Sequence, residues 1–254
     1  MSGRLFVIGL GPGDARYLTQ DAVEALQAAD ALYGYGPYLD RVPVRDGQSR
    51  YPSDNREEGE RARAALRYAA EGARVAIVSG GDPGVFAMAA SVCEEIEAGP
   101  PAWRTLELAI VPGITAMFAA AARAGAPLGH DFCALSLSDN LKPWELIERR
   151  LDAAAEAGFV IALYNPVSKA RPWQLGHAFA LLGRKLPAIV PVIFSRAVGR
   201  PDESLTVTTL QAADEVGADM ATLIIVGSAE TRVVPREGKT PLVYTPRAVA
   251  KVMA

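Results

Sequence analysis

Residues 75–86, which read V-A-I-V-S-G-G-D-P-G-V-F, constrain the fold of this chain more than any other segment. The first four residues form an uninterrupted apolar run, which is typical of a strand buried on both faces. The glycines and proline of residues 79–84 cannot continue that strand, so they predict a tight turn. An apolar segment that suits a helix follows at residues 85–96. In an open α/β sheet, this order places the turn outside the carboxyl end of a strand, where ligands bind.

The same order of strand, turn and helix recurs through the first half of the chain. Strands are predicted at residues 5–8, 31–33 and 106–111. Thr19 is expected to cap one helix, and Gly72 and Gly125 are expected to end two others. This alternation predicts a mostly parallel sheet that is covered on both faces.

The second half of the chain has a different pattern. Its predicted helices span residues 143–157 and 173–182, and its predicted strands span residues 132–137, 159–164, 189–194, 204–208 and 223–226. The last strands lie close together in sequence, which favours antiparallel pairs in a mixed sheet. We therefore expect an α/β fold of two α/β domains, residues 1–112 and 113–254, with the active-site cleft between them.

Composition limits the class of protein. The 254 residues are 50% hydrophobic and 22% charged, which is ordinary for a globular protein. A net charge of −3 argues against a general nucleic-acid surface. The sequence has neither a basic, apolar leader nor an 18-residue uncharged apolar span, so a soluble cytoplasmic protein without a membrane partner is expected.

Cysteine and histidine usage gives no sign of a metal site. Cys93 and Cys133 each lie in an apolar segment without paired metal-ligand spacing, so both are expected to be reduced thiols in the core. With two histidines in the whole chain, a structural zinc site is not expected.

The loop G-L-G-P-G-D at residues 9–14 invites a dinucleotide-binding interpretation. Asp14 replaces the third glycine of that fingerprint, and Pro12 removes a backbone donor that a pyrophosphate needs. The loop also lacks the Gly-Lys-Ser/Thr ending of a nucleotide-binding loop. These departures disfavour an oxidoreductase that uses a dinucleotide.

Five turns at predicted strand ends share a composition. They are rich in small residues and poor in candidates for a metal site, a nucleophile or a catalytic triad, which suits a compact ligand held by main-chain groups. They span residues 9–14, 80–82, 112–116, 164–166 and 226–228.

These turns carry a resemblance that covers almost the whole chain. The motifs G-L-G-P-G-D at Gly9, G-G-D-P at Gly80, V-P-G-I-T-A at Val111 and T-P-R at Thr245 occur in the order and approximate spacing of the tetrapyrrole methylases, which they resemble. That family uses S-adenosylmethionine and includes corrin-building and sirohaem-building methyltransferases.

Two further motifs resemble one branch of that family. They are S-L-S-D-N-L-x-P-W-x-x-I at Ser136 and Y-N-P-x-S-x-x-R at Tyr164. Members of the branch methylate carbon 17 of precorrin-3B and contract the macrocycle on the route to cobalamin. The resemblance implies that activity, with S-adenosylhomocysteine as a product, and a homodimer.

Carried over position by position, the resemblance implies two groups of cofactor contacts. The first half would supply Pro12, Gly80, Gly81, Asp82, Val85, Thr115 and Ala116. The second half would supply Tyr164 or Asn165, together with Ala197, Val226 and Gly227.

Physical chemistry gives some of these contacts plausible roles. Asp82 can accept a hydrogen bond from a ribose hydroxyl or attract a cation, while Val85 and Ala116 can offer apolar surface to adenine. Each also has a simpler interpretation: Asp82 as a surface residue of a structural turn, Val85 and Ala116 as core, and Thr115 as a helix cap.

The second step, ring contraction, needs proton removal from a hydroxyl and stabilisation of a departing lactone carboxylate. Ser138 and Asp139 are the candidates for positioning the proton, and Lys142 or Arg171 for stabilising the carboxylate. Alternatively, Asp139 belongs only to a loop before a helix. Basic residues that could face a polycarboxylate substrate are Lys142, Arg171, Arg196 and Arg200, although most such charges are simply solvated.

Several functions stay open at this point. The substrate is either metal-free or carries cobalt, and related branches methylate other corrin carbons. A different class is a non-catalytic protein that binds tetrapyrroles, which would have no use for S-adenosylmethionine.

Overall fold

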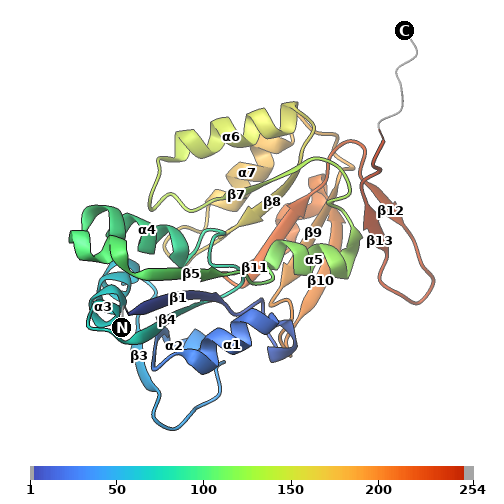
Figure 1. The fold of residues 1–254 in the computed structure, drawn as a ribbon. Coiled ribbons are helices and arrows are strands. Elements are labelled where there is room, and N and C mark those ends of the chain that lie inside the picture. Colours follow the sequence, from blue (N-terminus) through green and yellow to red (C-terminus); the bar gives the residue numbers. More distant parts are fainter. Residues whose placement is uncertain (1–2, 249–254) are drawn as a thin grey trace. The chain divides into compact units, whose positions relative to one another are not determined.

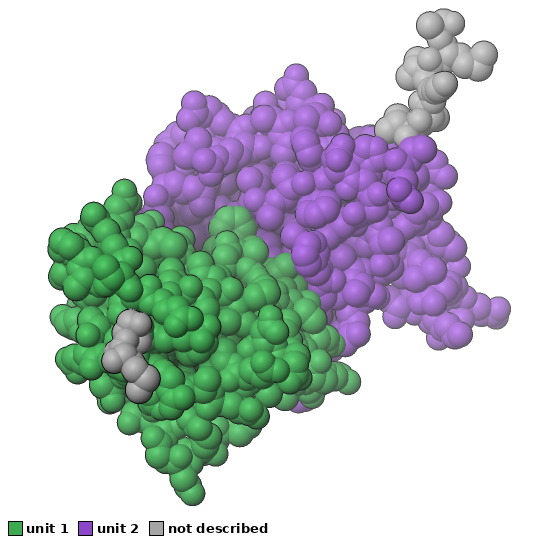
Figure 2. Space-filling view, viewed as in Figure 1, with its two compact units in different colours: residues 1–116 green, residues 117–254 purple. Residues whose placement is uncertain are grey.

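The computed structural model describes residues 3–248, which divide into two compact units. Unit 1 comprises residues 1–116 and unit 2 residues 117–254 (Figure 2). The domains expected from the sequence, 1–112 and 113–254, place the boundary at the preceding loop. That boundary and the cleft expected between the halves stay predictions.

Unit 1 contains a five-stranded sheet whose neighbouring strands are all parallel (Figure 1). The prediction of a mostly parallel first sheet is therefore confirmed. In spatial order the strands are β3 (Ser49–Ser53), β2 (Ala31–Tyr35), β4 (Arg74–Ser79), β1 (Arg4–Gly9) and β5 (Glu107–Val111).

Helices cover both faces of this sheet because successive side chains of a strand point to opposite sides. On β1, Leu5 and Val7 pack with the buried residues of α3 and α4, whereas Phe6 and Ile8 pack with those of α1. The helices are α1 (Gln20–Ala28), α2 (Gly36–Leu39), α3 (Glu58–Ala70) and α4 (Met88–Ala98), with short 3-10 turns η1 (Ala15–Tyr17) and η2 (Pro101–Thr105).

Two helix ends have the capping residues that the sequence predicts. The Thr19 hydroxyl accepts a hydrogen bond from the backbone N–H of Ala22 at 3.1 Å, which confirms the predicted cap of α1. Gly72 has a φ of 99° immediately after α3 and its capping residue, as expected of a glycine that ends a helix.

Two features of unit 1 differ from the predictions. Strand β3 was not among the predicted strands; it is an edge strand with a proline at position 52, and its side chains are largely exposed. Helix α4 begins at Met88 rather than at residue 85, because Phe86 has a φ of 53° that no right-handed helix accommodates.

Unit 2 contains the mixed sheet that the sequence predicts. Strands β7 and β8 are parallel, whereas β11 runs antiparallel to both β8 and β9, and β10 runs antiparallel to β9. In spatial order the strands are β10 (Ser204–Thr209), β9 (Pro191–Arg196), β11 (Thr222–Val226), β8 (Val160–Tyr164) and β7 (Phe132–Ser136).

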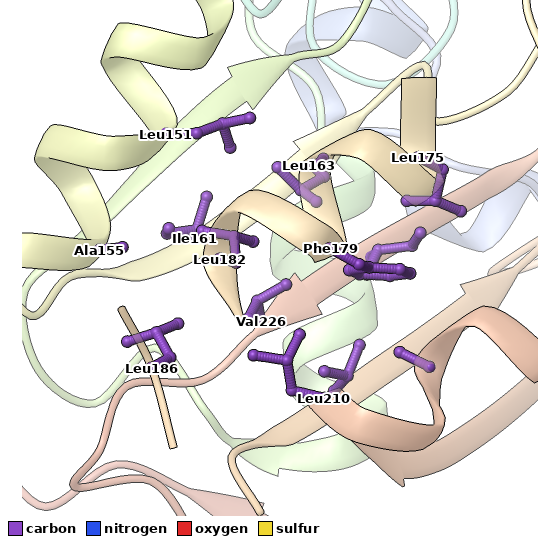
Figure 3. Close-up of a cluster of buried hydrophobic side chains, with 14 of the residues drawn as sticks. Leu151, Ala155, Ile161, Leu163, Leu175, Phe179, Leu182, Leu186, Leu210 and Val226 are labelled. Carbon is purple, nitrogen blue, oxygen red and sulfur yellow. The ribbon is translucent and has the colours of Figure 1, made fainter. Parts of the chain in front are cut away.

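One face of this second sheet forms the largest apolar core of the unit (Figure 3). Leu163 and Val226 from the sheet meet Phe179 and Leu182 from α7, all essentially excluded from solvent. The helical elements of unit 2 are α5 (Ala116–Ala124), whose first residue is the last of unit 1, α6 (Trp144–Glu156), α7 (Gln174–Leu182) and η3 (Leu210–Glu215).

A third, small sheet lies in unit 2 and was not predicted, because its strands are too short for a periodic pattern. It contains β12 (Arg232–Val234), β13 (Leu242–Tyr244) and β6 (Gly125–Ala126). The Thr245 hydroxyl closes it by donating to the carbonyl oxygen of Pro127 at 2.6 Å. The threonine of the T-P-R motif therefore has a structural role.

The cysteines depart from expectation in part. Cys93 is exposed, because it follows Val92 on α4 and lies off the buried face of that helix. Cys133 is half-buried, and burial raises the pKa of its thiol. From residue 3 to residue 248, no helix has the length and apolarity needed to cross a membrane.

Candidate functional site

Three loops of unit 1 meet at the carboxyl ends of neighbouring strands β4, β1 and β5. They are residues 10–14, 80–84 and 112–115. Gly11 and Gly81 exchange both backbone hydrogen bonds, at 3.1 and 2.9 Å, which joins the first loop to the second. The structure thus brings together the first-half turns that the sequence singled out.

Glycines make this meeting of backbones possible. A Cβ atom on Gly113 would lie 2.2 Å from the carbonyl oxygen of Gly81, and one on Gly9 would lie 2.7 Å from the same oxygen. No larger residue fits either position without moving backbone. Gly81 differs, because its Cβ would meet nothing closer than the Thr115 Cα at 3.7 Å, but its φ of 65° disfavours other residues.

Asp82 links the second loop to the third. Its Oδ1 accepts from the N–H of Gly84 at 2.8 Å, and its Oδ2 accepts from the N–H of Gly113 at 3.0 Å. An ionised carboxylate offers about four acceptor positions, so capacity for a further donor remains. Asp82 therefore shapes the loops as well as presenting negative charge.

Arg41 holds the first loop and was missed by the sequence analysis. Its Nη2 donates to the carbonyl oxygens of Leu10, Gly11 and Gly13 at 2.8, 2.9 and 2.8 Å. Pro12 is buried within this loop. Nothing in the sequence around Arg41 indicates the contact, since it joins positions about thirty residues apart.

The remaining predicted contacts of unit 1 lie beside these loops. Thr115 is buried, and Ala116, the first residue of α5, is partly buried. Both approach Gly81, because a Cβ there would lie 3.7 Å from the Thr115 Cα and 3.9 Å from the Ala116 nitrogen. Val85 is partly buried in the turn before α4.

In unit 2, the ends of β7 and β8 are joined through Ser136. Its buried hydroxyl accepts from Asn165 Nδ2 at 3.0 Å and from the backbone N–H of Ser138 at 3.3 Å. The neighbouring Tyr164 hydroxyl accepts from the N–H of Met117 in the first turn of α5, at 3.2 Å. Tyr164 and Asn165 therefore have well-defined partners within their own unit.

Arg171 connects the loop after β7 to the loop after β8. Its Nη1 donates to Asp139 Oδ1 and to Asn140 Oδ1, both at 2.6 Å, and reaches the Ser138 hydroxyl at 3.3 Å. Three of the four predicted catalytic residues, Ser138, Asp139 and Arg171, are thereby brought together. The fourth, Lys142, lies in the same loop and is partly buried.

This pairing affects what Asp139 and Lys142 can do chemically. The hydrogen bond from Arg171 holds the pKa of the Asp139 carboxyl below its usual value, which makes it a weak proton acceptor. Partial burial, followed by the nearby charge of Arg150, lowers the pKa of Lys142.

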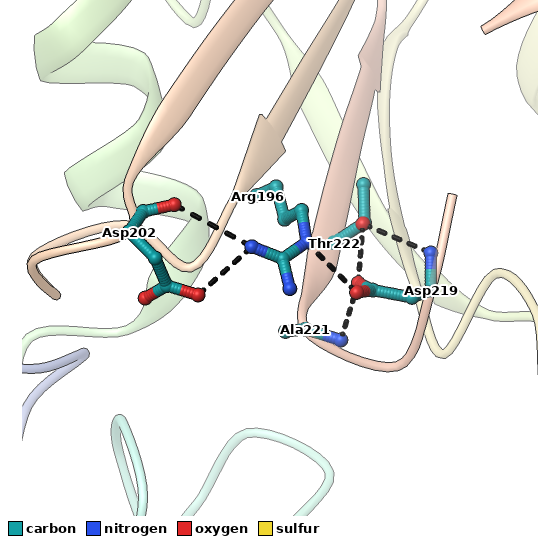
Figure 4. A network of polar contacts seen from close by, with 5 residues as sticks. All are labelled: Arg196, Asp202, Asp219, Ala221 and Thr222. Atoms are coloured by element: carbon teal, nitrogen blue, oxygen red, sulfur yellow. Dashed lines mark hydrogen bonds and ion pairs between the residues drawn. The ribbon is translucent and has the colours of Figure 1, made fainter. Parts of the chain in front are cut away.

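Arg196, proposed from the sequence to face the substrate, is instead engaged by two carboxylates (Figure 4). Its Nε donates to Asp219 Oδ2 at 2.8 Å and its Nη1 to Asp202 Oδ2 at 2.9 Å. Arg196 and Asp202 lie six residues apart, so their contact joins the two ends of the loop between them. That loop begins with Ala197, whose φ is 49°. Arg200 is exposed in the same segment.

Val226 and Gly227 do not lie near Tyr164 within unit 2. Because β11 is antiparallel to β8, Val226 pairs with Ile161, at the opposite end of β8 from Tyr164. The sequence located this turn at a strand end but carried no information on the direction of the strand.

Positive φ angles cluster in the predicted site loops. In the part of the chain that the structure describes, the non-glycine residues with positive φ are Phe86, Asn165 and Ala197. Such conformations cost about 1 to 3 kcal/mol each and often occur at functional sites. Two of the three, Asn165 and Ala197, are predicted cofactor contacts.

Comparison with known proteins places this arrangement among characterised folds. Residues 4–214 match the family model of the Tetrapyrrole (Corrin/Porphyrin) Methylases. A protein of Sinorhizobium sp named Precorrin-3B C(17)-methyltransferase is 64% identical over 250 residues, which cover 98% of each chain.

This chain is also similar to methyltransferases whose structures have been solved. A crystal structure of the methyltransferase CobJ has a TM-score of 0.90 and 48% identity, covering 96% of this chain and all of its own. A uroporphyrin-III C-methyl transferase from Thermus thermophilus, solved with S-adenyl homocysteine, has a TM-score of 0.68 and 24% identity, covering 89% and 98% of the two chains. The second likeness concerns the fold alone.

Proposed function

This chain belongs to the tetrapyrrole (corrin/porphyrin) methylase family, and from that premise we propose that it methylates carbon 17 of precorrin-3B with S-adenosylmethionine. The same enzyme would promote contraction of the corrin ring, giving precorrin-4 in cobalamin biosynthesis. The likeness to the Sinorhizobium protein along nearly the whole chain is the observation that carries this proposal.

The loops of unit 1 fit a cofactor of this kind. The backbone of Gly81 carries no side chain that would hinder a ligand, and the Asp82 carboxylate keeps acceptor capacity for a ribose hydroxyl. We propose contacts from unit 1 through Pro12, Gly80, Gly81, Asp82, Val85, Thr115 and Ala116. From unit 2 we propose Tyr164, Asn165 and Ala197, and we retain Val226 and Gly227 as the least supported contacts.

When bound, S-adenosylmethionine supplies an electrophilic methyl group, so the protein needs no nucleophile of its own. The task of the chain is to hold donor and acceptor carbon in line, which can supply up to roughly 7 to 11 kcal/mol of the acceleration. The doubly anchored Asp82 and the bridged glycines provide a rigid platform for that alignment.

Ring contraction would use the loop that Arg171 holds in place. We assign Ser138 to positioning the proton and Lys142, a cation without an ion pair in residues 3–248, to stabilising the departing carboxylate. Asp139 keeps Arg171 oriented rather than taking the proton, because its pKa is lowered.

We further propose a cytoplasmic homodimer. This part of the proposal derives from the family resemblance. Light scattering at micromolar concentrations tests it, since a constant monomeric mass contradicts the dimer.

The decisive experiment is incubation with S-adenosylmethionine and precorrin-3B, in parallel with its cobalt counterpart. We expect the metal-free compound to gain one methyl group and to change its absorbance as the ring contracts. Preference for the cobalt compound would contradict precorrin-3B as the substrate. Methylation at another carbon, located by NMR, would contradict the assignment to carbon 17.

Binding measurements separate the enzyme from a tetrapyrrole carrier. Calorimetry should show that the parent protein binds S-adenosylmethionine and that Asp82→Ala binds it more weakly, because each lost charged hydrogen bond is worth about 1.5 to 3 kcal/mol. A parent protein that binds the tetrapyrrole but no S-adenosylmethionine would contradict the methyltransferase proposal.

A further inference from the structure

Three aromatic rings form a cluster on unit 2 that the site described above does not use. Trp144 is the first residue of α6, Trp173 immediately precedes α7, and His177 lies one turn further along α7. The Trp173 ring lies 4.8 Å from the Trp144 ring and 4.9 Å from the His177 ring, measured between centroids. We call these three residues the aromatic shelf.

The shelf is fixed in position, and two of its three rings are open to solvent. The Trp144 indole N–H donates to Glu148 Oε1 at 2.8 Å, and the edge-to-face contacts restrain Trp173. Nevertheless, Trp173 remains 41% exposed, and His177 is also exposed. Helices α6 and α7 pack against each other (Figure 1), so the two supports of the shelf are held together.

The shelf adjoins the loops that carry the proposed chemistry. Trp173 follows Arg171 by two residues, and Trp144 follows Lys142 by two residues. Between Lys142 and Asn140 lies Leu141, which is 93% exposed. Exposed apolar side chains are therefore next in sequence to the segment that Arg171 anchors through Asp139.

Both signs of charge occur near the shelf, with Glu148 bonded to Trp144 and the cations Lys142 and Arg150 before and along α6. Arg150 on α6 is close enough to Lys142 for the two cations to repel each other. Neither side chain makes an ion pair with any other residue that the structure describes. Lys142, two residues before Trp144, and Arg150, on the helix that Trp144 begins, complement a ligand that has an unsaturated ring system bordered by carboxylates.

We propose that the aromatic shelf binds the ring system of the tetrapyrrole substrate, while Lys142 and Arg150 receive its peripheral carboxylates. This inference rests on the proposed function and identifies where the substrate is held. Contact with aromatic rings provides affinity that tolerates a large, flexible macrocycle, and the cations select for an acidic periphery. Trp173 and Trp144 are then substrate-binding residues, and Glu148 is a positioning residue for Trp144.

The tryptophans supply their own reporter. The chain has three tryptophans, and the third, Trp103, is buried in unit 1. In a Trp103→Phe background, fluorescence comes from the shelf alone. Titration with precorrin-3B should quench it with a midpoint that matches the Michaelis constant, whereas S-adenosylmethionine alone should leave it nearly unchanged.

Kinetics provide the second measurement. Trp173→Ala should raise the KM for the tetrapyrrole roughly 2- to 12-fold, the range expected for loss of one aromatic contact. The affinity for S-adenosylmethionine and kcat should change little, and Trp173→Phe should restore most of the KM. His177→Ala, at an exposed position, provides a milder variant should Trp173→Ala fail to fold.

Ile189→Ala is the matched control, because Ile189 is an apolar residue of unit 2 that is 73% exposed but lies away from the shelf in sequence. Its KM should equal that of the parent. An unchanged KM in active Trp173→Ala and His177→Ala variants overturns the shelf and leaves the methyltransferase proposal intact. Quenching that depends on protein concentration rather than on the tetrapyrrole overturns it in favour of contact between copies of the chain.

The two proposals can fail separately. If the parent protein performs no methyl transfer but the tetrapyrrole quenches the shelf, and Trp173→Ala weakens that binding, the shelf stands and the proposed function fails. If no tetrapyrrole quenches the shelf of an active enzyme, the function stands and the shelf fails.

Discussion

Gly113→Ala tests whether the three loops of unit 1 pack as closely as the structure describes. The added Cβ would lie 2.2 Å from the carbonyl oxygen of Gly81 and 2.9 Å from the Cα of Gly9. Both are backbone atoms, so no side-chain rotation relieves the contact. One of the loops has to move.

The size of that movement sets the expected cost. Real Cβ atoms essentially never lie closer than 3.0 Å to another heavy atom, so increasing the distance between the new Cβ and the Gly81 oxygen from 2.2 Å to 3.0 Å requires a shift of about 0.8 Å. Such a shift disrupts the bonds between Gly11 and Gly81, now 3.1 and 2.9 Å long. Each bond is worth about 0.5 to 1.5 kcal/mol, and residual overpacking costs about 1 to 3 kcal/mol. We expect a loss of about 2 to 6 kcal/mol in the free energy of unfolding.

Urea unfolding, followed by circular dichroism, measures this loss in comparison with two other glycine-to-alanine variants. Gly81→Ala should cost about 1 to 2 kcal/mol, because the new Cβ has space but the left-handed backbone is strained. Gly36→Ala is the control, since a Cβ there meets no atom within 4 Å. If Gly113→Ala unfolds at the same urea concentration as Gly36→Ala, the close packing of the loops is wrong.

Three further predictions concern single side chains. Arg171 holds the pKa of Asp139 below its usual 3.8, so the stability from this pair is complete above that pH and is lost as the pH falls through the lowered pKa. In Arg171→Gln, the pKa of Asp139 measured by NMR titration should therefore rise, and an unchanged pKa contradicts the pairing. Ser136→Ala leaves a part-buried amide without its acceptor and should cost about 1 to 3 kcal/mol in urea unfolding, whereas an unchanged midpoint would show that the hydroxyl is dispensable. Iodoacetamide should label exposed Cys93 well before Cys133, whose thiol pKa is raised by burial, and equal labelling rates measured by mass spectrometry would refute this order.

The fold was predictable where local chemistry decides it. The apolar run of β4, the cap at Thr19 and the glycine after α3 each act over a few residues, so the sequence alone indicates them. Strand β3 was missed because an edge strand needs no apolar pattern, and its polar side chains look like those of a loop.

The site was predictable as a set of turns but not as a set of contacts. Small residues at strand ends indicated the loops around Gly81 correctly, whereas the clamp by Arg41 depends on a meeting of distant segments. Likewise, Arg196 looked available for substrate because nothing local pairs it with Asp219, more than twenty residues away. The direction of β11, which separates Val226 from Tyr164, is also set by long-range pairing.

The bond from Thr245 to Pro127 affects how the chain folds as it is synthesised. The sheet of unit 1 has all its strands once residue 111 has been made, so it can form early. Strand β6 must instead wait for β13, and Pro127 for a partner 118 positions later. At about 5 to 20 residues per second, that interval lasts roughly 6 to 24 s. During it, Gly125 and Ala126 lack the strand that pairs with them, so the small sheet is completed only in the last stage of synthesis.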